Sequence, residues 1–503
     1  MKKLFILSTI ALSVSLASCD KFMDINQDPN SPSVDAITTD MLFPAAEMNL
    51  AGSYGDFLRI TGGYFAQHYS QQFGTSNYID YSRFEMSATR SSSTYQYLNA
   101  RALGNLKTVR EKAVASGDYA TNLAATALWA FTYQVLVDCY GELPYSQSFS
   151  GNPTPKYDEG ADIYAGVIKE LEDALAEPIN SQTCTNFLFP DKNSASWVQF
   201  ANAVLLKLYM RESGVADVQS KLDALVAEGN FPDSDVAYTN WTNEAGHMSP
   251  FYAEEFATNW GSTQVNLIGN IAIIRTMQER NAAGDIVYTD GRLAKFFAPN
   301  SAGNYTGGVS GTNFSTSEGD QKSTNYWNRP VASYDMPVYL ITVSETEFFL
   351  SEYYAKKADA GQAKAHYEAA VAASFASAGA SGAADAIAHW PYEQANYKKC
   401  IGLAKWIALA GTNNYEAWCE MRRLGYPTFG SVSGTQLYNE TSHVYNPDLY
   451  QAGTLYTPIQ VNGSLGSNKV LQRFPYAESS STRNANAPKQ DDTVYGTPVF
   501  WAK

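Results

Sequence analysis

The stretch SETEFFLSEYYAKKADAGQAKAHYEAAVAASF, residues 344–375, carries the clearest helical pattern of the chain. Apolar residues recur there at three- and four-residue spacing, which is typical of one buried helix face. Residues 359–361, Asp-Ala-Gly, interrupt the pattern and predict a turn. The positions expected to face the partner helix are Leu350 and Tyr354 before the turn, and Ala363, Tyr367 and Ala370 after it. The stretch therefore predicts two paired helices.

These large and small positions match a tetratricopeptide repeat, in which small alanines let paired helices approach closely. The match is incomplete, because Glu347 stands at the usual tryptophan position and Phe375 at the terminal proline position. One repeat cannot form a solenoid, so further pairs are needed. Weaker patterns predict them at residues 122–139 with 162–176, and at 194–213 with 218–228, with Ser194 as a helix cap.

Four long segments between the expected helices are rich in glycine, serine, asparagine and aromatic residues. They are residues 54–84, 241–263, 298–338 and 428–471. Loops of this length in a compact domain are usually functional or disordered, and the ring content favours function. Tyrosine is unusually common, with 34 tyrosines against 24 phenylalanines. No linker divides the chain, so we expect residues 41–503 to form a single domain.

The charge balance excludes one broad class of partner. The chain of 503 residues has 50 acidic and 35 basic side chains, a formal net charge of −15. A nucleic-acid binder needs a basic face, so we expect no nucleic-acid partner. The hydrophobic fraction of 45% is sufficient for a large core and excludes a disordered chain.

The N-terminus predicts export and lipid anchoring. Lys2 and Lys3 precede an apolar stretch at residues 4–17 that is too short to span a bilayer as a mature helix, so residues 1–18 are interpreted as a signal peptide. Its end, Leu-Ala-Ser-Cys19, resembles a bacterial lipobox, in which the cysteine is lipidated and becomes the mature N-terminus. The alternative is an ordinary signal peptide with an incidental cysteine. Residues 19–40 are polar, contain two prolines and are expected to form an extended arm.

The other cysteines do not suggest a metal site. Cys139, Cys184, Cys400 and Cys419 are far apart and show no C-x-x-C spacing, so zinc is not expected. Disulfides and small buried thiols both remain open, and we favour buried thiols.

Motifs for catalysis are absent from the sequence, including H-E-x-x-H, G-x-S-x-G and the phosphate-binding loops. Adjacent carboxylates such as Glu254 and Glu255 point about 100° apart on a helix and would not flank one glycosidic bond. Residues 24–35 resemble a calcium loop in spacing, but Pro29 occupies the glycine position. We therefore expect no enzyme activity, no cofactor and no metal.

The mixture that remains suits the capture of a sugar or a peptide. Aromatic rings can stack on the apolar faces of pyranoses while amides and guanidinium groups hydrogen-bond the hydroxyls. The candidate ligand-binding residues are Asn77, Tyr78, Tyr81 and Arg83, then Trp260, and then Tyr326 and Trp327. For each ring taken alone, a place in the core or in an interface is the more common outcome.

Several motifs together resemble the SusD/RagB family. Residues 22–32 resemble the segment that follows the family's lipidated cysteine, and residues 127–145, ALWAFTYQVLVDCYGELPY, resemble a family helix and its Pro-Tyr turn. Residues 415–427 are similar to the family's E-A-W and R-R-x-G-Y-P motifs, and residues 473–476 to its closing segment. The departures are Cys419 and Leu424, which replace more polar residues, and Ala477, where a proline is common.

The resemblance implies an all-α fold of tetratricopeptide-like helix pairs with long loop-rich excursions. It implies a lipid-anchored, surface-exposed protein of the outer membrane that captures an oligosaccharide, or sometimes a peptide, without turnover. The implied partner is a SusC-like TonB-dependent transporter. The shared motifs do not carry ligand specificity, so the nutrient stays open. A surface glycoside hydrolase and a protein-binding scaffold are the competing functions.

Overall fold

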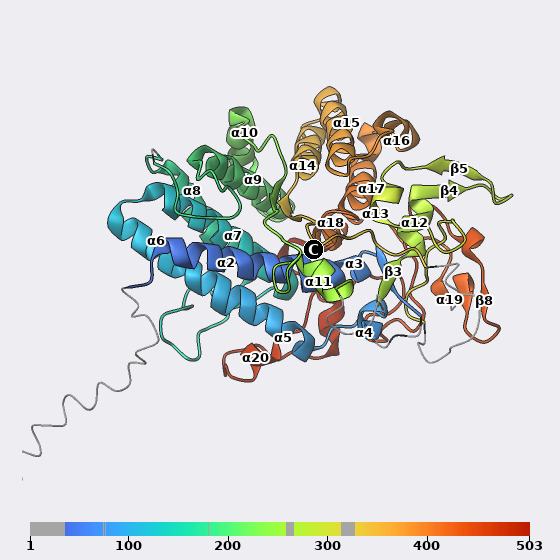
Figure 1. Ribbon diagram of the computed structural model, residues 1–503, viewed down its shortest axis with the longest axis horizontal. Helices are drawn as coiled ribbons and strands as arrows, with labels where there is room; N and C mark the ends of the chain where they lie inside the picture. Colours follow the sequence, from blue (N-terminus) through green and yellow to red (C-terminus); the bar gives the residue numbers. More distant parts are fainter. Residues whose placement is uncertain are drawn as a thin grey trace, which may run out of the picture.

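The computed structural model describes residues 36–73, 75, 77–179, 181–257, 266–312 and 327–502. This part of the chain is mainly helical and contains four helix pairs (Figure 1). The pairs are α7 (Tyr119–Tyr140) with α8 (Gly160–Ala176), α9 (Ser194–Glu212) with α10 (Gln219–Glu228), α14 (Val343–Lys356) with α15 (Ala360–Ser377), and α17 (Tyr397–Leu409) with α18 (Asn414–Leu424). The predicted all-α class with tetratricopeptide-like pairs is confirmed.

The hairpin predicted at residues 344–375 is present as α14 and α15. The small residues allow direct contact, since the hydroxyl of Ser351 donates to the carbonyl of Ala363 and that of Ser344 to the carbonyl of Ala370. Asp359 caps α15 by accepting a hydrogen bond from the backbone N–H of Gln362. One detail of the predicted caps is wrong: Asn193 caps α9, and Ser194 is already inside the helix.

Other helices surround the pairs, and Figure 1 shows α2, α5 and α6 below them. They are α2 (Thr39–Ser53), α3 (Arg59–Phe65), α4 (Ile79–Ser82), α5 (Ala88–Gln96), α6 (Gly104–Ser116), α11 (Pro250–Glu255), α12 (Ile271–Met277), α13 (Leu293–Phe296), α16 (Ala383–His389), α19 (Gly434–Leu437) and α20 (Glu478–Ser481). Shorter turns are η3 (Tyr54–Leu58), η4 (Tyr97–Leu103), η8 (Gln394–Asn396), η9 (Pro447–Leu449), η10 (Asp492–Gly496) and η11 (Phe500–Ala502).

Strands form four antiparallel two-stranded sheets in the described part of the chain. They are β1 (Tyr69–Gln71) with β3 (Leu267–Gly269), β2 (Val236–Tyr238) with β6 (Val338–Ile341), β4 (Gln278–Arg280) with β5 (Ile286–Thr289), and β7 (Tyr438–Asn439) with β8 (Val444–Tyr445). They tie the loop-rich excursions to the helices.

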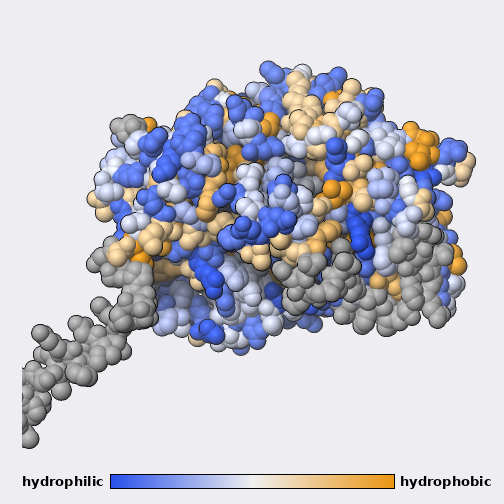
Figure 2. All heavy atoms as spheres, viewed as in Figure 1, coloured by the Kyte–Doolittle hydropathy of each residue, from blue (hydrophilic) through white to orange (hydrophobic). Residues whose placement is uncertain are grey.

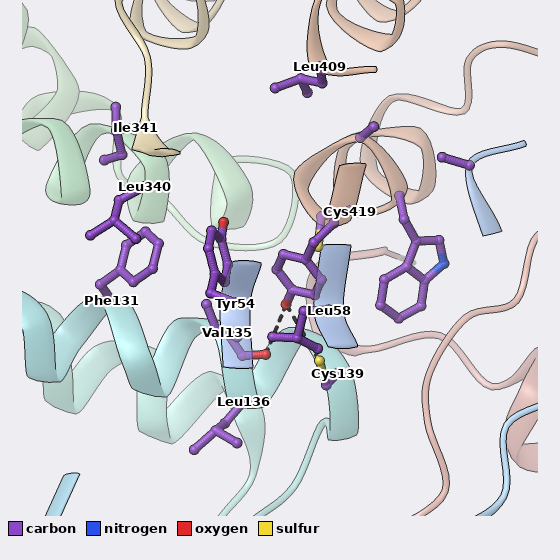
Figure 3. Close-up of a cluster of buried hydrophobic side chains, with 14 of the residues drawn as sticks. Tyr54, Leu58, Phe131, Val135, Leu136, Cys139, Leu340, Ile341, Leu409 and Cys419 are labelled. Carbon is purple, nitrogen blue, oxygen red and sulfur yellow. Dashed lines mark hydrogen bonds between the residues drawn. The ribbon is translucent and has the colours of Figure 1, made fainter. Parts of the chain in front are cut away.

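The segment expected to be a ring-rich loop at residues 54–84 is mostly a different structure. Helix α2 continues through η3 into α3, so the chain is helical from Thr39 to Phe65. Tyr54 and Tyr64 are buried, and Tyr54 packs edge-on against Phe131, with 5.4 Å between ring centroids (Figure 3). The expectation of a loop is wrong here because the glycines of this segment serve close helix packing. Four of its tyrosines belong to the core, Tyr54, Tyr64, Tyr69 and Tyr81, whereas Tyr78 is half-buried.

The core joins helices that are distant in sequence. The Tyr415 hydroxyl donates to the carbonyl of Val135 at 2.9 Å, beside Cys139 and Cys419 (Figure 3). Cys139, Cys184 and Cys419 are buried, Cys400 is half-buried, and all four are free thiols. Three of the four thus pack as small apolar side chains.

Within the residues described, no helix combines the length and apolar composition needed to cross a membrane.

Buried charges connect the helix pairs to one another. Arg211 of α9 pairs with Asp138 of α7 and with Glu416 of α18, and all three side chains are fully buried. Lys207, one turn earlier, lies 2.7 Å from Glu345 of α14. Although burial opposes ionisation, the charges of Arg211 and Lys207 hold the pKa of Glu416 below its ordinary value. This network therefore joins one helix from each of the four pairs.

Candidate functional site

The sequence clusters around residues 77–83 and 327 are tethered to one small sheet. Strand β1 leads into the segment before Asn77, and it pairs with β3, with Tyr69 opposite Gly269. The backbone N–H of Gly269 in turn donates to the carbonyl of Asn328, next to Trp327, at 2.6 Å. Residues more than 200 positions apart in sequence are therefore held at one place by backbone hydrogen bonds.

Tyr78 is the central side chain of the first cluster. Its hydroxyl donates to Glu255 Oε1 at 2.6 Å, and its ring stacks on Tyr81 with centroids 5.5 Å apart. Tyr78 has a φ of 64°, a left-handed conformation that is uncommon for a residue with a bulky side chain. Such strain is found where surrounding contacts fix a side chain in one orientation. The structure therefore holds the Tyr78 ring rigidly beside α11.

The neighbours of Tyr78 have different roles. Asn77 is exposed and donates through Nδ2 to Asn266 Oδ1 at 3.2 Å. Tyr81 is only 2% exposed and packs against Phe57 and Phe65, so it supports the Tyr78 ring from the core side. Arg83 is half-buried, and its backbone carbonyl accepts from Asn462. Of these four, Asn77 is exposed and Tyr78 is half-buried, and side-chain contacts fix the position of both.

Trp327 is half-buried, and the adjacent Asn328 is fully buried. Asn328 Oδ1 accepts from the N–H groups of Thr306 and Gly307, and its amide donates to two carbonyls. This asparagine orders the backbone rather than meeting a ligand. The other sequence-predicted residues, Cys19, Trp260 and Tyr326, lie outside the described residues.

A cavity of about 590 Å³ lies beside this cluster, between α2, η3, α5, η4 and α11. Its polar lining includes Ser53, Asp56, Arg90, Thr94 and Glu254, and its apolar lining includes Phe57 and Tyr97. Helices α2, α5 and α11 lie on the face of the molecule that is drawn in Figure 1. Figure 2 shows that this face is largely hydrophilic, with scattered apolar side chains. Phe57 connects the cavity to the first cluster through its edge contact with Tyr81, at 6.2 Å.

The electrostatics of the cavity are dominated by carboxylates. Burial, followed by the nearby charges of Glu254 and Glu255, raises the pKa of Asp56 to about 8. Burial also raises the pKa of Glu255, although the hydrogen bonds from Tyr78 and Asn266 oppose that shift. Glu255 is thus occupied on the Tyr78 side, whereas Glu254 and Asp56 face the cavity.

Sequence reasoning missed this cavity. Its lining comes from three separate segments, and no short motif joins Ser53, Asp56, Thr94 and Tyr97. The one available signal was Asp56 itself, a carboxylate between the aromatic residues Tyr54 and Phe57. In the sequence, Glu254 is one of two adjacent carboxylates, a pattern that does not indicate a cavity.

The chemistry of these groups suits binding. Among the described residues, no group of three or more histidine, cysteine, aspartate or glutamate side chains is placed to hold a metal ion. Rings, hydroxyls, an amide and carboxylates gather around one cavity and one exposed cluster, which is the composition of a small-molecule site.

Comparison with known proteins also indicates a binding protein. The model of a SusD-like family, described as starch-binding and associating with outer membrane, matches residues 29–445. A SusD homologue from Bacteroides uniformis is 21% identical, with a TM-score of 0.72, over 92% of this chain and 99% of that one. A SusD/RagB family protein from Bacteroides thetaiotaomicron is 18% identical, with a TM-score of 0.69, over 93% and 99%.

A chitin-binding SusD homologue from Flavobacterium johnsoniae is 17% identical, with a TM-score of 0.66, over 91% of this chain and 98% of that one. No curated protein matches the chain. At these identities the solved structures show the shared fold. The family model spans most of the sequence, and the chain therefore belongs to the SusD/RagB family of outer-membrane-associated binding proteins.

Proposed function

We propose that this protein is a lipid-anchored, surface-exposed protein of the outer membrane that captures an oligosaccharide and delivers it to a SusC-like TonB-dependent transporter, without turnover. In this proposal residues 1–18 are removed, Cys19 carries the lipid, residues 19–40 form the arm and residues 41–503 form one binding domain. The supporting observation is the Tyr78 cluster, in which a fixed ring and amides lie beside a polar cavity.

The nutrient class is assigned by analogy and by chemistry. The Flavobacterium johnsoniae relative is described as chitin-binding, and the family description names starch, which favours a glycan. A peptide is the second candidate, because carboxylates and amides also suit peptide groups. Isothermal titration against panels of oligosaccharides and peptides tests the choice: binding of peptides alone would replace the glycan assignment.

Trp260 and Trp327 are expected to act as stacking platforms. Replacing either by alanine should weaken oligosaccharide binding by about 1–3 kcal/mol, the scale of one buried aromatic contact. Titration calorimetry of Trp260→Ala and Trp327→Ala measures the effect, and Trp390→Ala, a half-buried tryptophan beyond α16, is the matched control. Unchanged affinity in both variants, with folding intact, would remove these residues from the site.

Lipidation at Cys19 is expected to hold the protein at the membrane. Several acyl chains on one residue anchor a soluble domain stably. The Cys19→Ala variant should move from the membrane fraction to the soluble fraction, whereas Cys400→Ala, a half-buried thiol of α17, should stay in place. Continued membrane association of Cys19→Ala would contradict the lipid anchor.

A further inference from the structure

The cavity between α2, α5 and α11 contains buried polar groups without partners. Ser53 is 8% exposed and Thr94 is 5% exposed, and both line the cavity. Neither hydroxyl forms a hydrogen bond within the described part of the chain. The protein does not enclose either oxygen, so both hydroxyls are open to the cavity and available to hydrogen-bond a polar ligand there.

The charged groups of the cavity indicate the sign of the ligand's charge. The carboxylates of Asp56 and Glu254 are half-buried and have no hydrogen-bond or ion-pair partner among the described residues. Glu255 follows Glu254 in α11, and its charge also acts on Asp56. Arg90 is the one cation among the lining residues, and it is exposed. The tyrosines facing this region, Tyr81 of α4 and Tyr97 of η4, add no positive charge. A buried carboxylate without a cation favours binding of a positive group.

The apolar lining specifies the shape of the ligand. Tyr97 is 41% exposed, and Phe57 lies across the cavity floor next to Asp56 in the chain. An aromatic surface beside hydroxyls and carboxylates matches a pyranose ring that carries both apolar C–H groups and polar substituents. A linear alkylammonium ion would leave the hydroxyls of Ser53 and Thr94 without partners.

We propose that this cavity binds a protonated amino sugar, with Asp56 and Glu254 as the anionic partners of its ammonium group. The inference rests on the proposed glycan capture and names the sugar class. Ser53 and Thr94 hydrogen-bond the ring hydroxyls, and the Tyr97 ring contacts the C–H face. A bound ammonium group favours the ionised form of Asp56, whose pKa burial and the neighbouring glutamates raise to about 8. In mild acid, Asp56 therefore releases a proton to the buffer when the ligand binds.

The test uses two oligomers that differ only in the amine. Titration calorimetry in mild acid compares a glucosamine tetramer with an N-acetylglucosamine tetramer, in two buffers of different ionisation enthalpy. The wild type should bind the amine form at least about ten-fold more tightly, which is about 1.4 kcal/mol, and release protons. Asp56→Asn and Glu254→Gln should each lose that preference, and Asp56→Asn should also lose the proton release.

The control is Asp233→Asn, which removes one exposed carboxylate before β2 and should keep the preference. Circular dichroism of each variant verifies folding. Equal affinity for the two oligomers, or a preference for the amine form that survives in Asp56→Asn, would overturn the amino-sugar assignment. In that case, binding of the neutral oligomer would still support the proposed glycan capture. If no sugar binds at all, the proposed function fails as well. Binding of lysine peptides in place of amino sugars, dependent on Asp56, would overturn the sugar class.

Discussion

Replacing Arg211 by methionine is expected to lower the free energy of unfolding by about 3–5 kcal/mol, because it leaves buried carboxylates without their cation. Arg211 contacts Asp138 and Glu416, and its side chain is 0% exposed. Asp138 also accepts hydrogen bonds from the Tyr164 hydroxyl at 2.6 Å and from the Trp501 indole at 2.7 Å. These donors keep Asp138 in place but supply no charge. Urea denaturation measures the loss.

The expected loss has a matched control on the surface. Lys169 and Asp173 of α8 form an ion pair at 2.6 Å, but their side chains are 72% and 65% exposed. Lys169→Met should therefore cost less than about 0.5 kcal/mol, because water replaces the partner. Adding Asp138→Asn to Arg211→Met should recover about 1 kcal/mol, because Asp138 loses its cation whereas Glu416 keeps Lys207 at 3.4 Å. A loss below about 1 kcal/mol in Arg211→Met would show that the network contributes little.

The sequence could not reveal this network. Lys207, Arg211 and Glu416 each stand on a helix where a charged residue normally marks a solvated face. Their burial arises because α9 packs against both α7 and α14, so that polar positions of these three helices and of α18 meet in the interior. Helical periodicity predicts which residues share a face, and it does not predict which face finds a charged partner.

Only part of the candidate site could be predicted from the sequence. Asn77 and Tyr78 were found because rings and amides are concentrated there, and the structure places them at the surface beside α11. Tyr81 follows the same sequence pattern but lies in the core, because Phe57 and Phe65 pack against its ring and Tyr78 stacks on it. The cavity was missed because its residues converge only after α2, α5 and α11 pack together.

Glycine was the residue type that most misled the sequence interpretation. Gly55, Gly62 and Gly63 contributed to the prediction of a loop at residues 54–84. In the structure Gly62 lies inside α3, where the backbone of α18 approaches closely. A glycine in a helix has two opposite readings, as a helix breaker or as a point of close contact, and only the facing element distinguishes them.

Replacing Gly62 by alanine is expected to destabilise the protein by about 3 kcal/mol through overpacking. An added Cβ would overlap the Cα of Tyr415 and lie 2.6 Å from its backbone nitrogen and 2.8 Å from the carbonyl oxygen of Asn414. All three atoms belong to the backbone at the start of α18, so no side chain can move aside. The helix must shift as a unit, which also disturbs the packing of Tyr415 against Tyr54.

Gly52→Ala separates this packing effect from the general effect of removing a glycine. Gly52 lies in α2 of the same continuous helix, and nothing lies within 4 Å of an added Cβ. The substitution should therefore stabilise the protein by about 0.5–1 kcal/mol, because alanine favours the helix and restricts the unfolded chain. Thermal and urea unfolding of both variants should move in opposite directions. Equal effects of the two substitutions would mean that α3 does not pack directly on the backbone of α18.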